Sequence, residues 1–261
     1  MIGVFDSGVG GLCALAVLKE RMPHADLLYF ADTENLPYGE KEPAVLLELT
    51  RRAVSLLLSE GAEAILAACG TVSTVVLPRL TDCPLPIYGV LRPTAEATGR
   101  SHSARGKDIL LLGTHATLKS GAFSREIQRC TQGATLHTLA CPLFVPLAES
   151  GRIAPHDALA RMYVSRILAP LRGYDIGTVV LGCTHFSHLL QHISREFPHA
   201  QVIDAAREAS LSLAASREKC ESGGGRIRLL TSKDPARLTE AARHMFPSLG
   251  LEAEEVHIPL K

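Results

Sequence analysis

Short apolar segments typical of β-strands alternate with longer amphipathic segments typical of helices, and this alternation constrains the fold more than any other feature. A first series of predicted strands occupies Ile2–Phe5, Leu27–Phe30, Ala64–Ala67 and Ile87–Val90, and a second occupies Ile109–Leu112, Thr135–Leu139, Thr178–Leu181 and Val202–Ile203. The predicted helices run from about Leu12 to Met22, Pro43 to Leu58, the turn at Gly113-Thr114 to Arg129, and Ala154 to Leu171. Strands joined through helices form parallel sheets, so the sequence predicts an α/β fold of two similar halves.

The two series divide the chain into two predicted domains. A loop expected at Leu91–Gly106, which contains Pro, Gly and Ser, would carry the chain from the first half to the second. Arg226–Leu230 has the composition of one more strand, so we expect the residues after Asp204 to return to the first half. The first domain is thus predicted to comprise residues 1–91 and 205–261, and the second residues 92–204. Such folds bind ligands at the carboxyl ends of their strands, which places the expected site in a crevice between the halves.

The amino-acid composition of the chain limits the kinds of molecule that it is expected to bind. The 261 residues carry 27 Lys and Arg against 27 Asp and Glu, and aromatic residues make up 5% of the chain with no Trp. A neutral chain with few aromatic residues lacks the charge and the stacking surfaces that nucleic-acid binding requires. No apolar run approaches the roughly 18 residues of a membrane span, and the N-terminus does not resemble a signal peptide. We therefore expect a cytoplasmic protein that acts on a small molecule and binds neither nucleic acid nor membrane.

Seven cysteines are scattered along the chain without a Cys-x-x-Cys pair, which argues against a disulfide framework or a structural zinc site. Two of them, Cys69 and Cys183, each follow the third predicted strand of their half. Free amides at the start of the next helix would lower the pKa of a thiol there, and His185 lies two residues after Cys183. Either cysteine alone would be assigned to the core, but their matching positions favour a pair of acid/base catalysts.

Two other interpretations of these cysteines remain open. Cys69, Cys183, His185 and His115 would supply enough ligands for a metal ion, although none has the short paired spacing of zinc sites. A redox pair is the second alternative, although no resolving cysteine lies beside either residue in sequence. Acid/base catalysis is favoured over both, and we expect no metal and no cofactor.

The segment Gly8-Val9-Gly10-Gly11 follows a predicted strand and precedes a predicted helix, as the glycine turn of a dinucleotide-binding fold does. Asp32 lies near the position of a ribose-binding acid in such folds. However, Cys13 replaces the third glycine, and Asp6 would repel a pyrophosphate at the start of the turn. A tight turn that exposes Asp6 and Ser7 to a crevice is the favoured interpretation.

Two further segments have both a structural and a functional interpretation. The amides and hydroxyls of Gly113–Thr117 could hold a carboxylate, or Thr114 and Thr117 could merely cap a helix. Glu149 follows an apolar segment and, taken alone, would be an ordinary acid at the end of a helix.

Six stretches together resemble the cofactor-independent aspartate/glutamate racemase superfamily, and within it the glutamate racemases. They occur in the order of that family, from the first strand to about Asp204. These stretches are Phe5-Asp6-Ser7-Gly8-Val9-Gly10-Gly11-Leu12, Pro37-Tyr38-Gly39-Glu40-Lys41, Cys69-x-Thr71, Gly113-Thr114-x-x-Thr117-x-Lys119-Ser120-Gly121, Cys141–Glu149 and Gly182-Cys183-Thr184-His185.

The resemblance implies two flavodoxin-like parallel-sheet domains related by pseudo-symmetry, a homodimer, and interconversion of L- and D-glutamate for peptidoglycan synthesis. Cys69 would take the α-proton of the D-enantiomer and Cys183 that of the L-enantiomer, assisted by Asp6 and His185 respectively, with Glu149 near the second pair. The residues implied to surround the substrate are Asp6, Ser7, Pro37, Tyr38, Gly39, Gly70, Thr71, Thr114, Thr117, Thr184 and His185. Without a cofactor to accept electrons, donors around the carboxylate must stabilise the carbanion.

Gly70 departs from the family pattern, which has Asn between the first cysteine and the threonine. The missing amide would normally donate a hydrogen bond to a substrate carboxylate, which is worth roughly 1.5–3 kcal/mol. Water, a shifted loop or a different substrate, which would mean an altered amino-acid specificity, could offset the loss; otherwise Gly70 is expected to mark a weakened racemase or an impaired amino-acid-binding homologue. If the crevice is otherwise intact, Gly70→Asn is expected to raise activity on glutamate.

Overall fold

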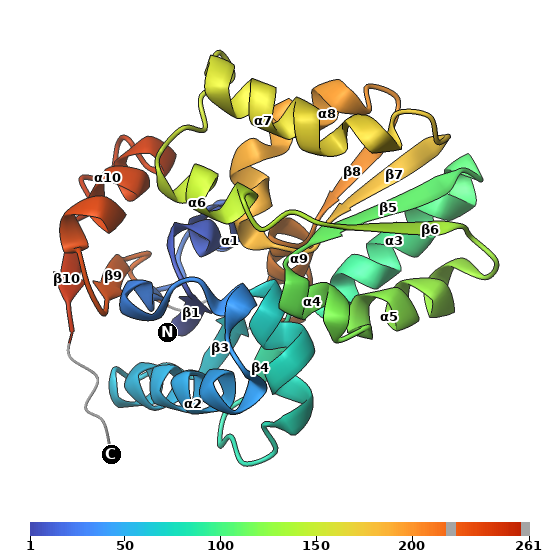
Figure 1. Ribbon diagram of the computed structural model, residues 1–261. Helices are drawn as coiled ribbons and strands as arrows, with labels where there is room; N and C mark the ends of the chain where they lie inside the picture. The colour runs from blue at the N-terminus through green and yellow to red at the C-terminus, as the bar shows by residue number, and fades with distance from the viewer. Residues whose placement is uncertain (218–222, 257–261) are drawn as a thin grey trace.

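A computed structural model describes residues 1–217 and 223–256, and it contains two parallel β-sheets (Figure 1). The first sheet has the strand order β10-β9-β2-β1-β3-β4 and the second has the order β6-β5-β7-β8. The strands are β1 (Ile2–Asp6), β2 (Leu27–Ala31), β3 (Ala64–Ala67), β4 (Ile87–Gly89), β5 (Asp108–Gly113), β6 (Leu136–Ala140), β7 (Ile176–Leu181), β8 (Gln201–Asp204), β9 (Ile227–Thr231) and β10 (Ala253–Glu255). Every strand in the sequence prediction is present, and the α/β fold of two parallel sheets is confirmed.

Helices connect the strands and cover both sheets. They are α1 (Leu12–Arg21), α2 (Pro43–Ser59), α3 (Leu91–Arg105), α4 (His115–Lys119), α5 (Ala122–Thr131), α6 (Phe144–Glu149), α7 (Ala158–Leu168), α8 (Leu190–Glu196), α9 (Ala205–Arg217) and α10 (Pro235–Met245). Within residues 1–217 and 223–256, no helix has the length and apolarity that would let it cross a membrane.

The loop predicted at Leu91–Gly106 is wrong, because helix α3 occupies this segment. Pro93 lies in the first turn, where a backbone N–H has no helical partner and its loss costs little. The hydroxyls of Thr94 and Thr98 donate to the carbonyls of Val90 and Thr94, one turn earlier, and both side chains are buried. Polar residues that looked like a surface loop therefore lie inside a packed helix, against α5 and α9.

The helix predicted from residue 115 to Arg129 is two helices, α4 and α5, because the chain turns at Gly121. Gly121 has a φ of 66°, which side chains other than glycine rarely adopt. The helix predicted from Ala154 starts later, at Ala158. Asp157 caps it by accepting a hydrogen bond from the amide of Ala160 at 2.9 Å.

The carboxyl ends of the two sheets face each other across the junction of the two halves. Strands β1 and β2 are buried along their whole length, as the central strands of a parallel sheet are. Helix α4 of the second sheet contacts the helical turns Tyr38–Glu40 and Val72–Val76, which follow strands of the first sheet. The segment after Asp204 contributes α9, which contacts α1, and β9, which pairs with β2. The residues that follow β1, β3, β5 and β7 are thus brought together.

Candidate active site

Asp6 and Cys69 form one side of the site. Asp6 ends β1, Cys69 lies two residues beyond β3, and both are buried. The Asp6 carboxylate accepts hydrogen bonds from the amide of Ser7 at 2.8 Å and from the hydroxyl of Thr184 at 2.9 Å, and the Cys69 thiol also donates to it. Burial raises the pKa of Asp6, and burial together with the Asp6 charge raises the pKa of the Cys69 thiol well above its usual range. The thiol and carboxyl therefore form a pair that retains a proton.

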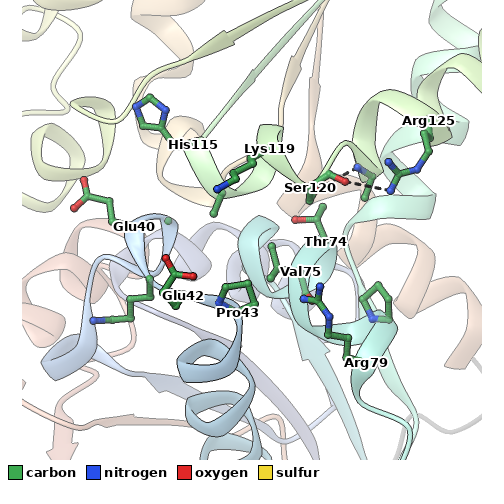
Figure 2. Close-up of a pocket in the computed structure, with 15 residues that line it drawn as sticks. Glu40, Glu42, Pro43, Thr74, Val75, Arg79, His115, Lys119, Ser120 and Arg125 are labelled. Atoms are coloured by element: carbon green, nitrogen blue, oxygen red, sulfur yellow. Dashed lines mark hydrogen bonds between the residues drawn. The ribbon is translucent and has the colours of Figure 1, made fainter.

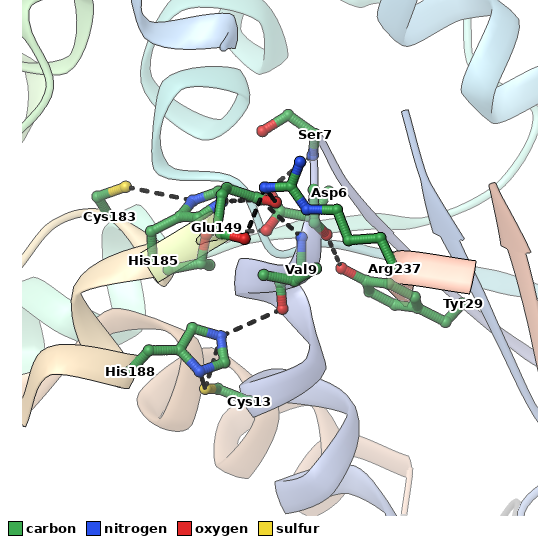
Figure 3. Close-up of polar contacts among 12 residues, drawn as sticks. Asp6, Ser7, Val9, Cys13, Tyr29, Glu149, Cys183, His185, His188 and Arg237 are labelled. Atoms are coloured by element: carbon green, nitrogen blue, oxygen red, sulfur yellow. Dashed lines mark hydrogen bonds and ion pairs between the residues drawn. The ribbon is translucent and has the colours of Figure 1, made fainter. Parts of the chain in front are cut away.

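Cys183, His185 and Glu149 form the opposite side. Cys183 follows β7, and the Nδ1 atom of His185 lies 3.9 Å from its sulfur. The Nε2 atom of His185 lies 2.6 Å from the Oε1 atom of Glu149, at the end of α6 (Figure 3). Burial opposes the charged form of His185, but hydrogen bonds to Cys183 and Glu149 raise its pKa well above the usual range. Glu149, which the resemblance implies near Cys183 and His185 although its local sequence alone suggests an ordinary helix-end acid, is thus a buried partner of the histidine.

Arg237 is a member of this cluster that the sequence analysis did not single out. It lies on α10, and its Nη2 atom is 2.7 Å from the Oε2 atom of Glu149 and 2.7 Å from the backbone oxygen of the same residue. Nothing in the local sequence distinguishes Arg237 from other arginines on amphipathic helices. Only the return of the C-terminal segment to the first sheet brings it to Glu149.

The glycine turn after β1 is packed against the second half, which contradicts the dinucleotide-binding interpretation. A Cβ atom added at Gly10 would lie 2.6 Å from the Thr184 hydroxyl and 2.8 Å from Nδ1 of His185. The amide of Val9 donates to Oε1 of Glu149 at 3.0 Å. The second half occupies the space that a pyrophosphate would need here, so the glycines serve close approach of the two halves.

Asp32, the residue placed near a ribose-binding position, has a structural role instead. It is buried, and its carboxylate accepts hydrogen bonds from the hydroxyl of Tyr38 at 2.6 Å, the hydroxyl of Ser232 at 2.7 Å and the side-chain amide of Asn35 at 3.0 Å. It therefore fixes Tyr38 beside the site and ties the chain after β9 to the end of β2.

Three threonines from both halves form a hydroxyl cluster. The Oγ1 atom of Thr71 lies 3.2 Å from that of Thr114 and 3.3 Å from that of Thr117. Thr114 also accepts a hydrogen bond from the amide of Thr117, so it caps α4. The capping interpretation is therefore confirmed for Thr114, and the carboxylate-binding interpretation stays a prediction for which the cluster offers rotatable hydroxyl donors.

Pro37, Tyr38 and Gly39 lie against this cluster. The Leu36–Pro37 peptide bond is cis. A Cβ atom at Gly39 would lie 2.7 Å from Cβ of Thr114, so only glycine permits this approach to α4. The sequence-predicted residues Ser7, Pro37, Tyr38, Gly39, Thr71, Thr114, Thr117 and Thr184 thus lie in segments that meet at the junction.

Gly70 lies against the backbone of the second half, which argues against the gain in activity expected for Gly70→Asn. A Cβ atom at position 70 would overlap the carbonyl oxygen of Gly182 and would lie 3.1 Å from its carbonyl carbon. An asparagine at this position requires the backbone at Gly182 to shift or the two halves to separate. Glycine is therefore required by the close approach of Gly182 in this arrangement, and the lost amide is only one consequence of it.

A cavity of about 570 Å³ lies beside the junction (Figure 2). Its lining includes Gly39 and Thr74, next to the segments just described, and the charged side chains Glu40, Lys41, Glu42, Arg79, Lys119 and Arg125. His115, a ligand in the alternative metal site, also lines it. Across the described ranges 1–217 and 223–256, no three His, Cys, Asp or Glu side chains are grouped so as to hold a metal ion.

This chain is similar in sequence and in fold to known glutamate racemases. A glutamate racemase of Thermus thermophilus is 37% identical over 98% of this chain and 94% of its own, and one of Gloeobacter violaceus is 36% identical over 93% and 91%. The crystal structure of a Thermus thermophilus glutamate racemase in complex with β-chloro-D-alanine superimposes with a TM-score of 0.83 at 34% identity, covering 98% of this chain and 96% of that one. The model of the Asp/Glu/Hydantoin racemase family matches residues 16–211. The chain belongs to the Asp/Glu/Hydantoin racemase family.

Proposed function

We propose that the protein is a glutamate racemase, which interconverts L- and D-glutamate without a cofactor. The observation that carries the proposal is the pair of buried thiols at the ends of β3 and β7, each with its own acid/base partner. Cys69 adjoins the Asp6 carboxyl, and Cys183 adjoins the His185–Glu149 pair. Two independent proton carriers in different sheets are what inversion at one carbon requires, because the proton leaves one face and returns to the other. Relatives named as glutamate racemases specify the substrate.

In the proposed reaction, one thiolate takes the α-proton of glutamate and the other thiol donates its proton to the opposite face. Cys69 acts on D-glutamate and Cys183 on L-glutamate. Asp6, which the Cys69 thiol contacts, accepts the thiol proton as the thiolate forms, and burial, which raises the pKa of Asp6, makes its carboxylate a stronger base than an exposed one. His185 exchanges a proton with Cys183 through Nδ1, while Glu149 stabilises the imidazolium through Nε2. One proton is removed and one returned, so no oxidant or cofactor is needed.

The hydroxyls at the junction stabilise the carbanion in this proposal. Ser7, Thr184 and the cluster of Thr71, Thr114 and Thr117 supply donors that can turn toward the α-carboxylate as negative charge develops on it. The substrate ammonium lies near the Asp6 carboxylate. The three hydroxyls of the cluster bond to one another and that of Thr184 donates to Asp6, so these buried polar atoms are paired.

The two sheets form the cores of two domains in this proposal, residues 1–91 with 205–261 and residues 92–204. The contact of Gly70 with Gly182 then belongs to a closed arrangement, and the domains separate to admit glutamate. Closure excludes water from the thiols and aligns them with the α-carbon.

The cellular setting follows from the same function. We propose that the enzyme is cytoplasmic, where thiols stay reduced, and that its D-glutamate enters peptidoglycan. We also propose a homodimer. Exposed apolar side chains at Leu143, Leu159 and Tyr163, which are 53%, 37% and 40% exposed, form a surface near α6 and α7 that a second copy would cover.

Circular dichroism of L- and D-glutamate, with purified protein and no added cofactor, tests the proposal. Both enantiomers should converge on the racemic mixture, and aspartate should react much more slowly. Cys69→Ser and Cys183→Ser should each abolish racemisation, whereas Cys130→Ser, a thiol on α5, should leave it unchanged. Failure of the unmodified protein to invert glutamate would refute the assignment, and binding without inversion would favour an amino-acid-binding homologue.

A further inference from the structure

Arg237 lies outside the segment that the racemase family model matches, yet it contacts the buried acid of the Cys183 side. The family match ends at residue 211, whereas α10 begins at Pro235. Arg237 is anchored by two interactions with the same residue, to the carboxylate and to the backbone oxygen of Glu149, both at 2.7 Å. Its own side chain is 40% exposed, whereas that of Glu149 is 3% exposed. The partly exposed guanidinium of Arg237 is thus paired with the almost fully buried carboxylate of Glu149.

The two oxygens of Glu149 have different partners. Oε1 accepts from the Val9 amide and bonds to Nε2 of His185, whereas Oε2 makes no hydrogen bond within the described residues and is ion-paired with Arg237 at 2.7 Å. A buried carboxylate is costly unless it is paired, and each oxygen held in place restricts rotation of the whole group. Because Arg237 also binds the backbone oxygen at the end of α6, it fixes both the carboxylate and the helix end that carries it.

We propose that Arg237 is a positioning residue for the Cys183 half of the reaction, acting through Glu149 on His185. The chain of contacts runs from Arg237 to Glu149, then to His185, and ends at the Cys183 sulfur. With Arg237 in place, Oε1 stays directed at Nε2 of His185, which keeps Nδ1 directed at the sulfur. The Cys69–Asp6 pair has no contact with Arg237 among the interactions of the described residues. The inference rests on the proposed racemase function.

Racemisation rates alone cannot reveal this asymmetry. The two enantiomers have equal free energies, so kcat/KM must be the same in both directions for every variant.

A partial reaction that uses one cysteine at a time avoids the constraint. With β-chloroglutamate, one thiolate removes the α-proton, the electron pair forms the Cα–Cβ double bond, and chloride leaves. The resulting enamine is hydrolysed by water to a keto acid and ammonium. Elimination from the L-enantiomer reports on Cys183 and elimination from the D-enantiomer on Cys69.

The experiment compares Arg237→Met with unmodified protein, measuring chloride release from each enantiomer. We expect kcat/KM for the L-enantiomer to fall by about ten- to a hundredfold, the range for one hydrogen bond to a charged group, and that for the D-enantiomer to stay within about twofold. Arg237→Lys keeps the charge and should recover most of the L-activity. Arg243→Met, on the same helix but paired with exposed Glu252 at 3.6 Å, is the matched control and should change neither rate.

A second comparison tests whether Arg237 acts through Glu149. In a Glu149→Gln background, Arg237→Met should have little further effect on either enantiomer, because the carboxylate it positions is gone. Equal losses for both enantiomers in Arg237→Met, or no loss for either, would overturn the inference while leaving racemase activity intact. If the unmodified protein does not invert glutamate, the proposed function itself fails, so the two failures are distinguishable. Should Arg237→Met unfold, Arg237→Gln, which also removes the charge, takes its place, and a loss that is equal for the two enantiomers or absent for both overturns the inference.

Discussion

Substitution of Gly70 tests whether the two halves close as tightly as the structure shows. In Gly70→Ala, the new methyl group would overlap the carbonyl oxygen of Gly182 and lie 3.1 Å from its carbonyl carbon. Carbon and carbonyl oxygen normally approach to about 3.3–3.6 Å, so the halves must separate or the backbone must shift. Forcing one methyl group into a packed contact costs about 1–3 kcal/mol, which corresponds to a loss of about 5- to 150-fold in kcat/KM if closure precedes proton transfer.

The assay pairs activity with stability, because the contact lies between the halves. The added methyl group disturbs closure but leaves each sheet packed, so the melting temperature should change little while kcat/KM for glutamate falls. Gly173→Ala is the matched control, since a Cβ atom there would meet no atom within 4 Å. Gly70→Asn should be at least as impaired as Gly70→Ala. An asparagine variant that is more active than the unmodified protein would refute the argument, because it would show that the crevice has room for the amide donor.

Three further outcomes follow from the site. With β-chloroglutamate, Cys69→Ser should retain elimination from the L-enantiomer and Cys183→Ser from the D-enantiomer; loss of both by either variant, with the fold intact, would contradict the two-sided mechanism. Dialysis against EDTA should leave racemisation unchanged, and activity restored by a divalent metal would revive the metal site. The raised pKa of His185 stabilises the folded state fully below the unfolded pKa near 6.5, and this stabilisation is lost as pH rises through the folded pKa. The lowered pKa of Glu149 stabilises the folded state above about pH 4.3, and this stabilisation is lost as pH falls through the folded pKa. The loss of thermal stability in His185→Gln should therefore be largest at about pH 5–6, and a loss that is uniform from pH 4 to 9 would contradict the ion pair.

The strands and the two thiol positions could be predicted from the sequence because their signals are local. Apolar runs, glycine turns and polar residues directly after a strand identify the carboxyl edge of a parallel sheet without knowledge of the partner. Helix α3 was missed because Pro93, Gly99 and several serines and threonines suggest a loop on composition. Only the packed structure shows that the threonine hydroxyls bond back to their own helix.

The remaining features depend on contacts between distant segments. Arg237 and Glu149 are 88 residues apart, and neither has a local pattern that points to the other. Gly70 was interpreted from the missing amide, whereas the backbone of Gly182 decides which side chain fits. The sequence identifies which segments carry the chemistry, but distances across the junction arise only when both halves are folded.

The position of β9 beside β2 sets an order of events during synthesis. Strand β2 ends at Ala31 and β9 begins at Ile227, so the ribosome adds about 200 residues before the strand that covers this edge exists. At about 5–20 residues per second, Leu27–Ala31 spends roughly 10–40 s as an unpaired apolar edge. Such edges recruit strands from other chains, so nascent or prematurely terminated chains that lack β9 should aggregate unless chaperones shield them. The same late segment carries Arg237, so this protein should acquire its complete Cys183 side only after its last strands have docked.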